Sequence, residues 1–149
     1  MAAIKGGKKF EAAMADLARR VSRPGTLRVG FLENAKYPDG TPVAMIAAIQ
    51  DFGAPSVGIP PRPFFRNMIK DKQSEWPKAV ADLLRANNYD AVRALELAGS
   101  AIAGQLRQSI IDTNSPPLAE TTIQRKGFSK PLVDSGHMLN SVDYEVKEG

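Results

Sequence analysis

The stretch DAVRALELAGSAIAGQLRQSIID, residues 90–112, has the longest helical periodicity of the chain. Asp90 is a favourable N-cap, because its carboxylate can accept hydrogen bonds from the free N–H groups of a first helical turn. Larger apolar side chains then recur every three or four residues, which is the spacing of one helical face: Val92, Leu95, Ile102, Leu106 and Ile110. The pattern predicts one long helix over about 90–112, and the rest of the fold must be arranged around it.

Small residues interrupt the apolar face of this helix. Ala98, Gly99 and Ala103 leave little side chain along its middle, so another backbone can approach closely there. We therefore predict close packing at these three positions, and they are candidates for contacts between subunits.

Other segments of the chain have equally regular patterns. Apolar residues at helical spacing predict a helix from Phe10 to Val21, which Pro24-Gly25 ends. They also predict shorter helices that start with a Thr41 cap and Pro42 in the first turn, over about 63–72, and after a Ser74 cap. Strict alternation predicts two strands, Leu27–Phe31 and Val142–Val146. Leu118 to Gln124 can form a further short helix, and Asp134 or Ser135 can cap another turn.

These elements predict an α+β fold, with a small, mostly antiparallel sheet packed against several helices. Two strands alone are marginal, so we expect a third from residues 33–40, from the proline-rich stretch after Gly53, or from a neighbouring subunit. Residues 1–9 are small, basic and glycine-containing, which predicts a flexible basic arm. Residues 10–149 are then a single domain.

Composition excludes several classes of protein. The 149 residues are 43% hydrophobic and 24% charged, with no cysteine and one histidine, so thiolate metal sites, disulfides and cysteine nucleophiles are excluded. No apolar run approaches the roughly 20 residues that cross a bilayer, and the N-terminus lacks the apolar core of a secretory signal. We expect a soluble protein without membrane contact, cofactor or metal.

The net charge of +4 comes from one segment. Residues 1–23 hold six basic side chains against two acidic ones, whereas the remaining chain has fourteen of each; the six are Lys5, Lys8, Lys9, Arg19, Arg20 and Arg23. Such a segment could contact DNA phosphates without sequence preference, or an acidic protein partner, although charged helix faces are more often simply solvated. A small DNA-binding or packaging accessory protein is therefore the alternative function.

One cluster has the residue types of a hydrolase. Asp134, Ser135 and His137 lie within four residues, but a catalytic base and its orienting group normally come from separate elements. Asp134, Ser135 and Gly136 also suit a helix start or a tight turn. We therefore predict a structural turn and no enzymatic activity, with a hydrolase as the third and weakest hypothesis.

The most unusual segment is rich in proline. Residues 54–63 contain four prolines, and the loop continues into aromatic residues: Ile59, Pro60, Pro61, Arg62, Pro63, Phe64 and Phe65. Proline fixes φ and removes a hydrogen-bond donor, which favours a rigid connector. A preordered loop can also dock on a partner with little loss of chain entropy, so both interpretations stay open.

An ordered set of short motifs resembles a known family. Four motifs occur in this order: Asp51-Phe52-Gly53, then Ile59-Pro60-Pro61-Arg62-Pro63-Phe64, then Pro117-Leu118 to Lys126-Gly127, then Lys130-Pro131-Leu132-Val133-Asp134-Ser135-Gly136 with Leu139 and Ser141. Together they are similar to the neck or tail-completion proteins of tailed bacteriophages, over most of the chain from about Leu27.

The resemblance implies a small α+β virion protein that forms a homo-oligomeric ring at the head–tail junction. Its partners would be other copies of itself, portal-side connector proteins of the head, and tail terminator or tail-tube proteins, with nonspecific contact to DNA in the channel as a further possibility. It would lie in the virion, and in the host cytoplasm during assembly. The family has no catalytic residues to transfer to this chain.

Overall fold

The computed structural model describes residues 6–22, 25–113 and 136–148. Its longer elements are α1 (Gly7–Ser22), β1 (Gly25–Phe31), α2 (Val43–Phe52), α3 (Phe64–Lys72), α4 (Trp76–Ala86), α5 (Ala91–Asp112), α7 (His137–Asn140) and β2 (Val142–Glu148). Two 3₁₀ turns, η1 (Pro55–Val57) and η2 (Gln73–Glu75), precede α3 and α4. The predicted α+β class is confirmed.

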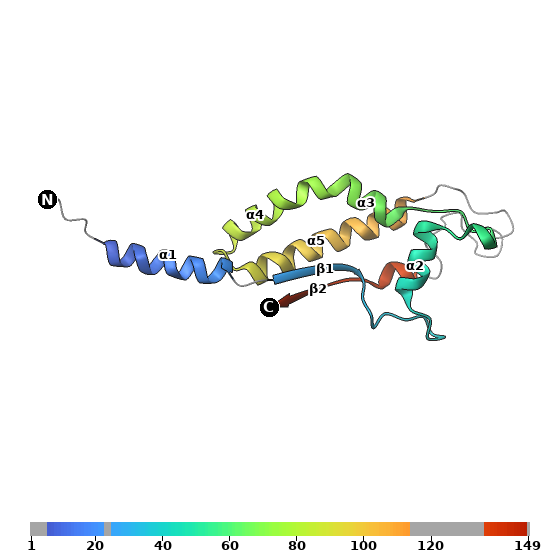
Figure 1. Cartoon of the computed structure of the whole chain (residues 1–149), viewed down its shortest axis with the longest axis horizontal. Coiled ribbons are helices and arrows are strands. Elements are labelled where there is room, and N and C mark those ends of the chain that lie inside the picture. Colours follow the sequence, from blue (N-terminus) through green and yellow to red (C-terminus); the bar gives the residue numbers. More distant parts are fainter. Residues whose placement is uncertain (1–5, 23–24, 114–135, 149) are drawn as a thin grey trace.

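Helix α5 is the central layer of the body. It has 22 residues and begins where the sequence predicts, with the Asp90 carboxylate accepting a hydrogen bond from the Arg93 N–H. Figure 1 shows α3 and α4 along one side of α5 and the two strands along the other. Because both sides of α5 are covered, its buried positions extend around much of the helix.

The sheet consists of β1 and β2, paired antiparallel from Gly25 opposite Glu148 to Phe31 opposite Val142. No third strand joins them among the described residues. The 33–40 region and the proline-rich stretch form only the isolated bridges Lys36–Pro42 and Ala54–Ile59, so the expectation of a third strand from either is wrong. The face that packs on α5 stabilises this short sheet instead of a third strand.

The hydrophobic core lies where α2, α3, α5 and α7 meet the start of β2. Phe64, Leu106, Ile110, Val43 and Val142 are its largest fully buried side chains. Polar contacts tie the layers together: Trp76 Nε1 donates to Gln105 Oε1 at 2.9 Å, and Arg107 donates to the Val142 carbonyl at 2.8 Å. Apolar burial therefore stabilises the body, and these hydrogen bonds join its layers.

Helix α1 projects from one end of this body (Figure 1). It begins at Gly7, three residues before the predicted start, so Lys8 and Lys9 belong to a helix and not to a flexible arm. No residue of α1 is buried. In the described part of the chain, no helix is both long enough and apolar enough to cross a membrane.

Two helix starts differ slightly from their predictions. Glu75, and not Ser74, precedes the first turn of α4, and Pro42 precedes that of α2. Neither end has a side-chain cap. The predicted short helix at residues 118–124, and the predicted cap at Asp134 or Ser135, lie outside the described residues.

Candidate functional site

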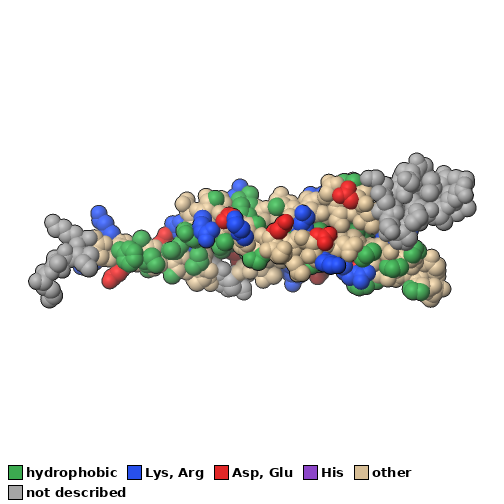
Figure 2. Space-filling view, turned by 90° about the horizontal axis from the view of Figure 1, so that it is seen from above, with side chains coloured by type: hydrophobic (Ala, Val, Ile, Leu, Met, Phe, Trp, Pro, Cys, Tyr) green, Lys and Arg blue, Asp and Glu red, His purple; other side chains and the backbone are tan. Residues whose placement is uncertain are grey.

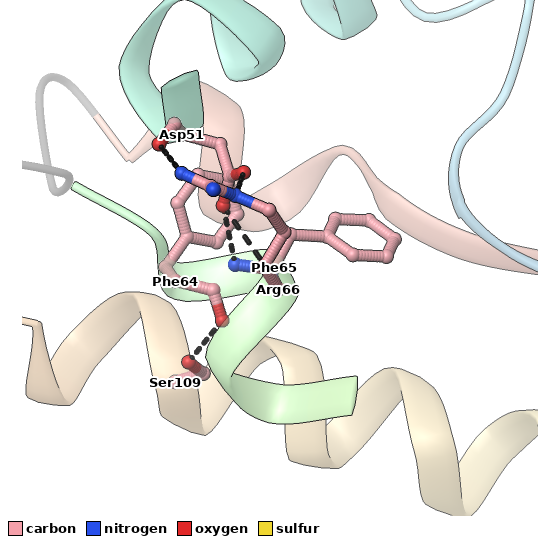
Figure 3. Close-up of polar contacts among 5 residues, drawn as sticks. All are labelled: Asp51, Phe64, Phe65, Arg66 and Ser109. Carbon is pink, nitrogen blue, oxygen red and sulfur yellow. Dashed lines mark hydrogen bonds and ion pairs between the residues drawn. The ribbon is translucent and has the colours of Figure 1, made fainter. Parts of the chain in front are cut away.

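The proline-rich motif and Asp51 form one structural unit, which we call the α2–α3 junction (residues 51–66). The Asp51 side chain, at the end of α2, accepts hydrogen bonds from the backbone N–H groups of Phe65 and Arg66 at 3.0 and 3.3 Å. Asp51 thus caps the N-terminus of α3 from 14 residues away, and its negative charge lies at the positive end of that helix. Figure 3 shows these contacts converging on one carboxylate.

Arg66 completes this cap. Its Nε donates to Asp51 Oδ2 at 2.6 Å, and its NH2 donates to the Asp51 carbonyl oxygen at 2.7 Å. The guanidinium carbon lies 4.5 Å from the centre of the Phe52 ring, a cation–π distance. One arginine therefore binds both the side chain and the backbone of the last turn of α2.

Gly53 allows the chain to turn between the two helices. Its φ is +76°, a conformation that residues with a side chain rarely adopt. A Cβ atom here would lie 2.7 Å from the Pro61 nitrogen and 2.9 Å from the Ile59 carbonyl oxygen. The loop folds back on Gly53, with the Ala54 and Ile59 backbones paired in both directions at 2.8 and 3.0 Å.

The predicted docking loop is only partly accessible. Phe64 is fully buried and Arg62 is 6% exposed, whereas Pro60 and Pro61 are exposed and Ile59, Pro63 and Phe65 are half-buried. The docking prediction is therefore wrong for Phe64 and Arg62, since both side chains are buried within the subunit. The Phe64 carbonyl oxygen accepts a 2.6 Å bond from the Ser109 hydroxyl of α5 (Figure 3).

The Arg62 side chain is held in an unusual environment. Its NH1 lies 3.4 Å from the Pro60 carbonyl oxygen, and its buried Nε has no hydrogen-bond partner. Burial lowers the pKa of this guanidinium from its ordinary value, because a poorly solvated cation is destabilised. The backbone of Arg62 is better satisfied, since its N–H donates to the Gln50 carbonyl oxygen at 2.7 Å.

An apolar cavity of about 360 Å³ opens beside this junction. It lies between β1, the outer face of α2 and the start of α3. The lining includes Phe31, Ala44, Ala48, Phe52 and Phe65, with few polar groups. Such a surface suits an apolar side chain better than a charged small molecule.

The small residues of α5 pack within the subunit. Ala98, Gly99 and Ala103 are buried, and a Cβ on Gly99 would lie 2.6 Å from Tyr144 Cδ2 and 2.7 Å from Leu27 Cδ1. The predicted close packing is confirmed, but the neighbour is the chain's own sheet. These positions are therefore unavailable for contacts between subunits.

The described basic residues of the N-terminal segment divide into two groups, those with ion pairs and those without. Arg19 and Arg20 bind Asp16 at 3.0 and 2.7 Å, and Arg20 also donates to the Asn88 carbonyl oxygen at 2.9 Å, which links α1 to the α4–α5 turn. Lys8 and Lys9 are exposed on the first turn of α1. Lys5 and Arg23 lie outside the described residues.

The histidine of the suspected hydrolase cluster makes structural contacts. Its Nε2 lies 2.8 Å from the Lys36 carbonyl oxygen, and because a carbonyl only accepts, this nitrogen must donate. The ring also packs 4.7 Å from that of Tyr37. His137 thus ties α7 to the 33–40 loop, and Asp134 and Ser135 lie outside the described residues. Across the described ranges, no three His, Cys, Asp or Glu side chains are grouped as metal ligands.

Comparison with protein-family models, with curated proteins and with solved structures gives no match. The function must therefore be inferred from the chain's own residues and geometry.

Sequence reasoning missed two features, one in the junction and one on α2. The capping of α3 by Asp51 joins residues 14 apart, and no local pattern reveals a cap that far from its helix. The exposed outer face of α2 was recognisable in principle, because eight of its ten residues are apolar, more than one buried face needs.

Proposed function

We propose that this chain is a structural virion protein of a tailed bacteriophage, a neck or tail-completion protein. It forms an oligomeric ring at the head–tail junction and joins the head connector to the tail. Its partners are further copies of itself, portal-side proteins, and tail terminator or tail-tube proteins. It acts without catalysis, in the virion and, during assembly, in the host cytoplasm.

The observation that carries this proposal is the ordered set of motifs, of which the first two are physically linked. Asp51-Phe52-Gly53 and Ile59–Phe64 are separate in sequence, yet Gly53 lies directly against Ile59 and Pro61, and the Asp51 carboxylate binds the Phe65 N–H immediately after the second motif. Residues that must occur together for a structural reason are a better basis for resemblance than the same residues scattered independently.

The surface of the molecule also supports an assembly role. Large hydrophobic side chains are exposed on α1, on α2 and at η1, at opposite ends of the elongated structure, as Figure 2 shows in green. Exposed apolar surface of this kind is typical of interaction sites. The Asp51 carboxylate and the His137 ring, by contrast, are engaged in structural hydrogen bonds.

The direct test is the state of assembly of the purified full-length chain. Native mass spectrometry and negative-stain electron microscopy are expected to detect rings, and binding assays to detect affinity for connector or tail-tube proteins of the same phage. A protein that stays monomeric over the whole accessible concentration range, and binds none of these components, would contradict the proposal.

The DNA-binding alternative has a separate test. Lys8 and Lys9 are the exposed basic residues of the segment that have no ion pair in the described structure. If phosphate contact is the function, duplex binding must weaken steeply with salt and weaken further in the Lys8→Gln/Lys9→Gln variant. Absence of binding even at low salt would exclude this alternative and leave the ring proposal intact.

A further inference from the structure

Helix α1 has an apolar stripe that the described part of the chain leaves mostly exposed, with only Leu17 half-buried. Phe10, Met14, Leu17 and Val21 fall on one face, and Phe10 is 66% exposed. The opposite face carries Lys8, Ala12 and Arg19. An amphipathic helix gains most of its stability by burying its apolar face, so a helix that buries none is expected to have a partner.

Helix α2, at the other end of the molecule, also has an exposed apolar face. Only Val43, Ala47 and Asp51 of its ten residues are buried. Ala44 and Ala48 form a flat exposed surface beside the 360 Å³ cavity, with the exposed Phe52 ring at its edge. Small side chains along a helix allow a second helix to approach closely, and the cavity can admit a large apolar side chain from it.

We propose that the apolar face of α1 docks on the outer face of α2 of a second copy of this chain, in a head-to-tail contact. The two surfaces lie at opposite ends of one molecule (Figure 1), so a single chain cannot bring them together. A contact between two different surfaces repeats from copy to copy and closes into a ring when the rotation allows. This inference rests on the proposed ring and names the surfaces that build it.

Charge favours this pairing over self-pairing of either surface. Helix α1 has four basic and two acidic side chains, a net charge of +2. The loop that leads into α2 carries Glu33 and Asp39 against Lys36, a net charge of −1, and it is joined to the start of the helix by the Val43 N–H bond to the Ala35 carbonyl oxygen. The one charged residue of α2 itself, Asp51, is paired with Arg66. A hydrogen bond from the Thr41 N–H lowers the pKa of Asp39, which keeps it charged. Two α1 helices in contact would instead bring together surfaces of like charge.

The lengths of α1 and α2 are also compatible with this contact. At 1.5 Å per residue, the 16 residues of α1 extend about 24 Å and the 10 residues of α2 about 15 Å. Helix α1 can therefore cover α2 along its whole length, with one large side chain of α1 seated in the cavity.

The first experiment uses three full-length variants, each with one exposed alanine or phenylalanine changed to aspartate. Phe10→Asp disrupts the α1 stripe, Ala48→Asp disrupts the α2 surface, and Ala12→Asp places the same charge on the other side of α1. Burial of a phenylalanine and of the surface that it contacts predicts association about 10- to 100-fold weaker for the first two. The Ala12→Asp protein is expected to assemble as the wild type does, and far-UV circular dichroism should show equal folding in all three.

Mixing the two disrupted variants identifies which surfaces pair. At the lowest concentration at which the wild type assembles, each alone is expected to be monomeric; together they should form a one-to-one dimer and nothing larger, because one intact contact remains. If Ala48→Asp alone still dimerises, α1 pairs with α1; if Phe10→Asp alone does so, α2 pairs with α2. Either result overturns the head-to-tail contact.

A cross-linking measurement covers the case in which a variant is poorly folded. Because the chain has no cysteine, Met14→Cys and Ala48→Cys proteins, one carrying a mass tag, can be mixed and oxidised. The contact predicts tagged–untagged disulfide dimers well in excess of the half that random pairing of the two proteins gives, whereas a random distribution of the three dimers would contradict it. Rings that persist in both aspartate variants would refute this contact and leave the proposed function standing. A wild type that stays monomeric would refute the contact, and one that also binds no connector or tail component would refute both.

Discussion

Two ion pairs of nearly equal length lie in very different surroundings. Arg66 and Asp51 meet at 2.6 Å in the α2–α3 junction, and Arg20 and Asp16 meet at 2.7 Å on α1. The Asp51 side chain is 5% exposed and the Asp16 side chain 42% exposed. The Arg–Asp pair therefore stabilises the α2–α3 junction but contributes little to stability on α1, because solvent screens an exposed pair.

The aromatic residues repeat this contrast. Phe64 is fully buried against α5, and Phe10 is 66% exposed on α1. Each is apolar, and each lies at the N-terminal part of a helix. The difference shows that helical periodicity specifies a face to be buried, while only the arrangement of the other elements decides whether the chain itself buries it.

The largest expected effect separates these two aromatic residues. Phe64→Ala should lower the free energy of unfolding by about 3–5 kcal/mol, because it removes a fully buried ring and leaves a cavity. Phe10→Ala, measured on dilute monomer, should stay within about 0.5 kcal/mol of the wild type. Urea unfolding followed by circular dichroism measures both, and similar losses would contradict the division.

The second comparison uses the two carboxylates. Asp51→Ala removes the cap of α3 and the partner of Arg66, and loss of a cap together with a charge-assisted hydrogen bond predicts about 2–3 kcal/mol of destabilisation. Asp16→Ala should change stability by less than about 0.5 kcal/mol. If the two variants have the same unfolding midpoint, the Asp51 cap does not hold the junction together.

Much of the fold could be predicted from the sequence, because its signals are local. The Asp90 cap, the apolar spacing of residues 90–112 and the alternation of both strands are patterns over a few residues, and α5, β1 and β2 confirm them. The third strand was expected from a general rule about small sheets, and packing of the sheet on α5 makes it unnecessary.

The junction was harder to predict, because its interactions link distant residues. The loop was expected to be either a connector or a docking segment, and burial places two of its seven side chains, Arg62 and Phe64, in the interior. Gly99 was predicted to allow close approach, but the sequence does not say whether the neighbour is another subunit or the chain's own Tyr144. Burial depends on tertiary contacts that periodicity cannot identify.

The smallest expected effect tests the same contrast on the two faces of α5. Gly104 is exposed with no atom within 4 Å of an added Cβ, so Gly104→Ala should stabilise the protein by up to about 1 kcal/mol through helix propensity. Gly99→Ala has the same propensity gain, but overlap with Tyr144 and Leu27 costs about 1–3 kcal/mol, so the net effect should be a loss. Thermal unfolding of both variants gives the signs, and stabilisation by Gly99→Ala would contradict the close packing of α5 on the sheet.

The most direct test of the division between a fold-forming junction and an assembly-forming helix is amide hydrogen exchange of the full-length protein over a series of concentrations. The N–H groups of Phe65 and Arg66, bound to Asp51, are predicted to exchange slowly at every concentration. Those of α1 are predicted to exchange rapidly in dilute protein and to become protected as copies associate. Protection of α1 that does not change with concentration, or exchange at Phe65 and Arg66 as fast as in α1, would contradict the account.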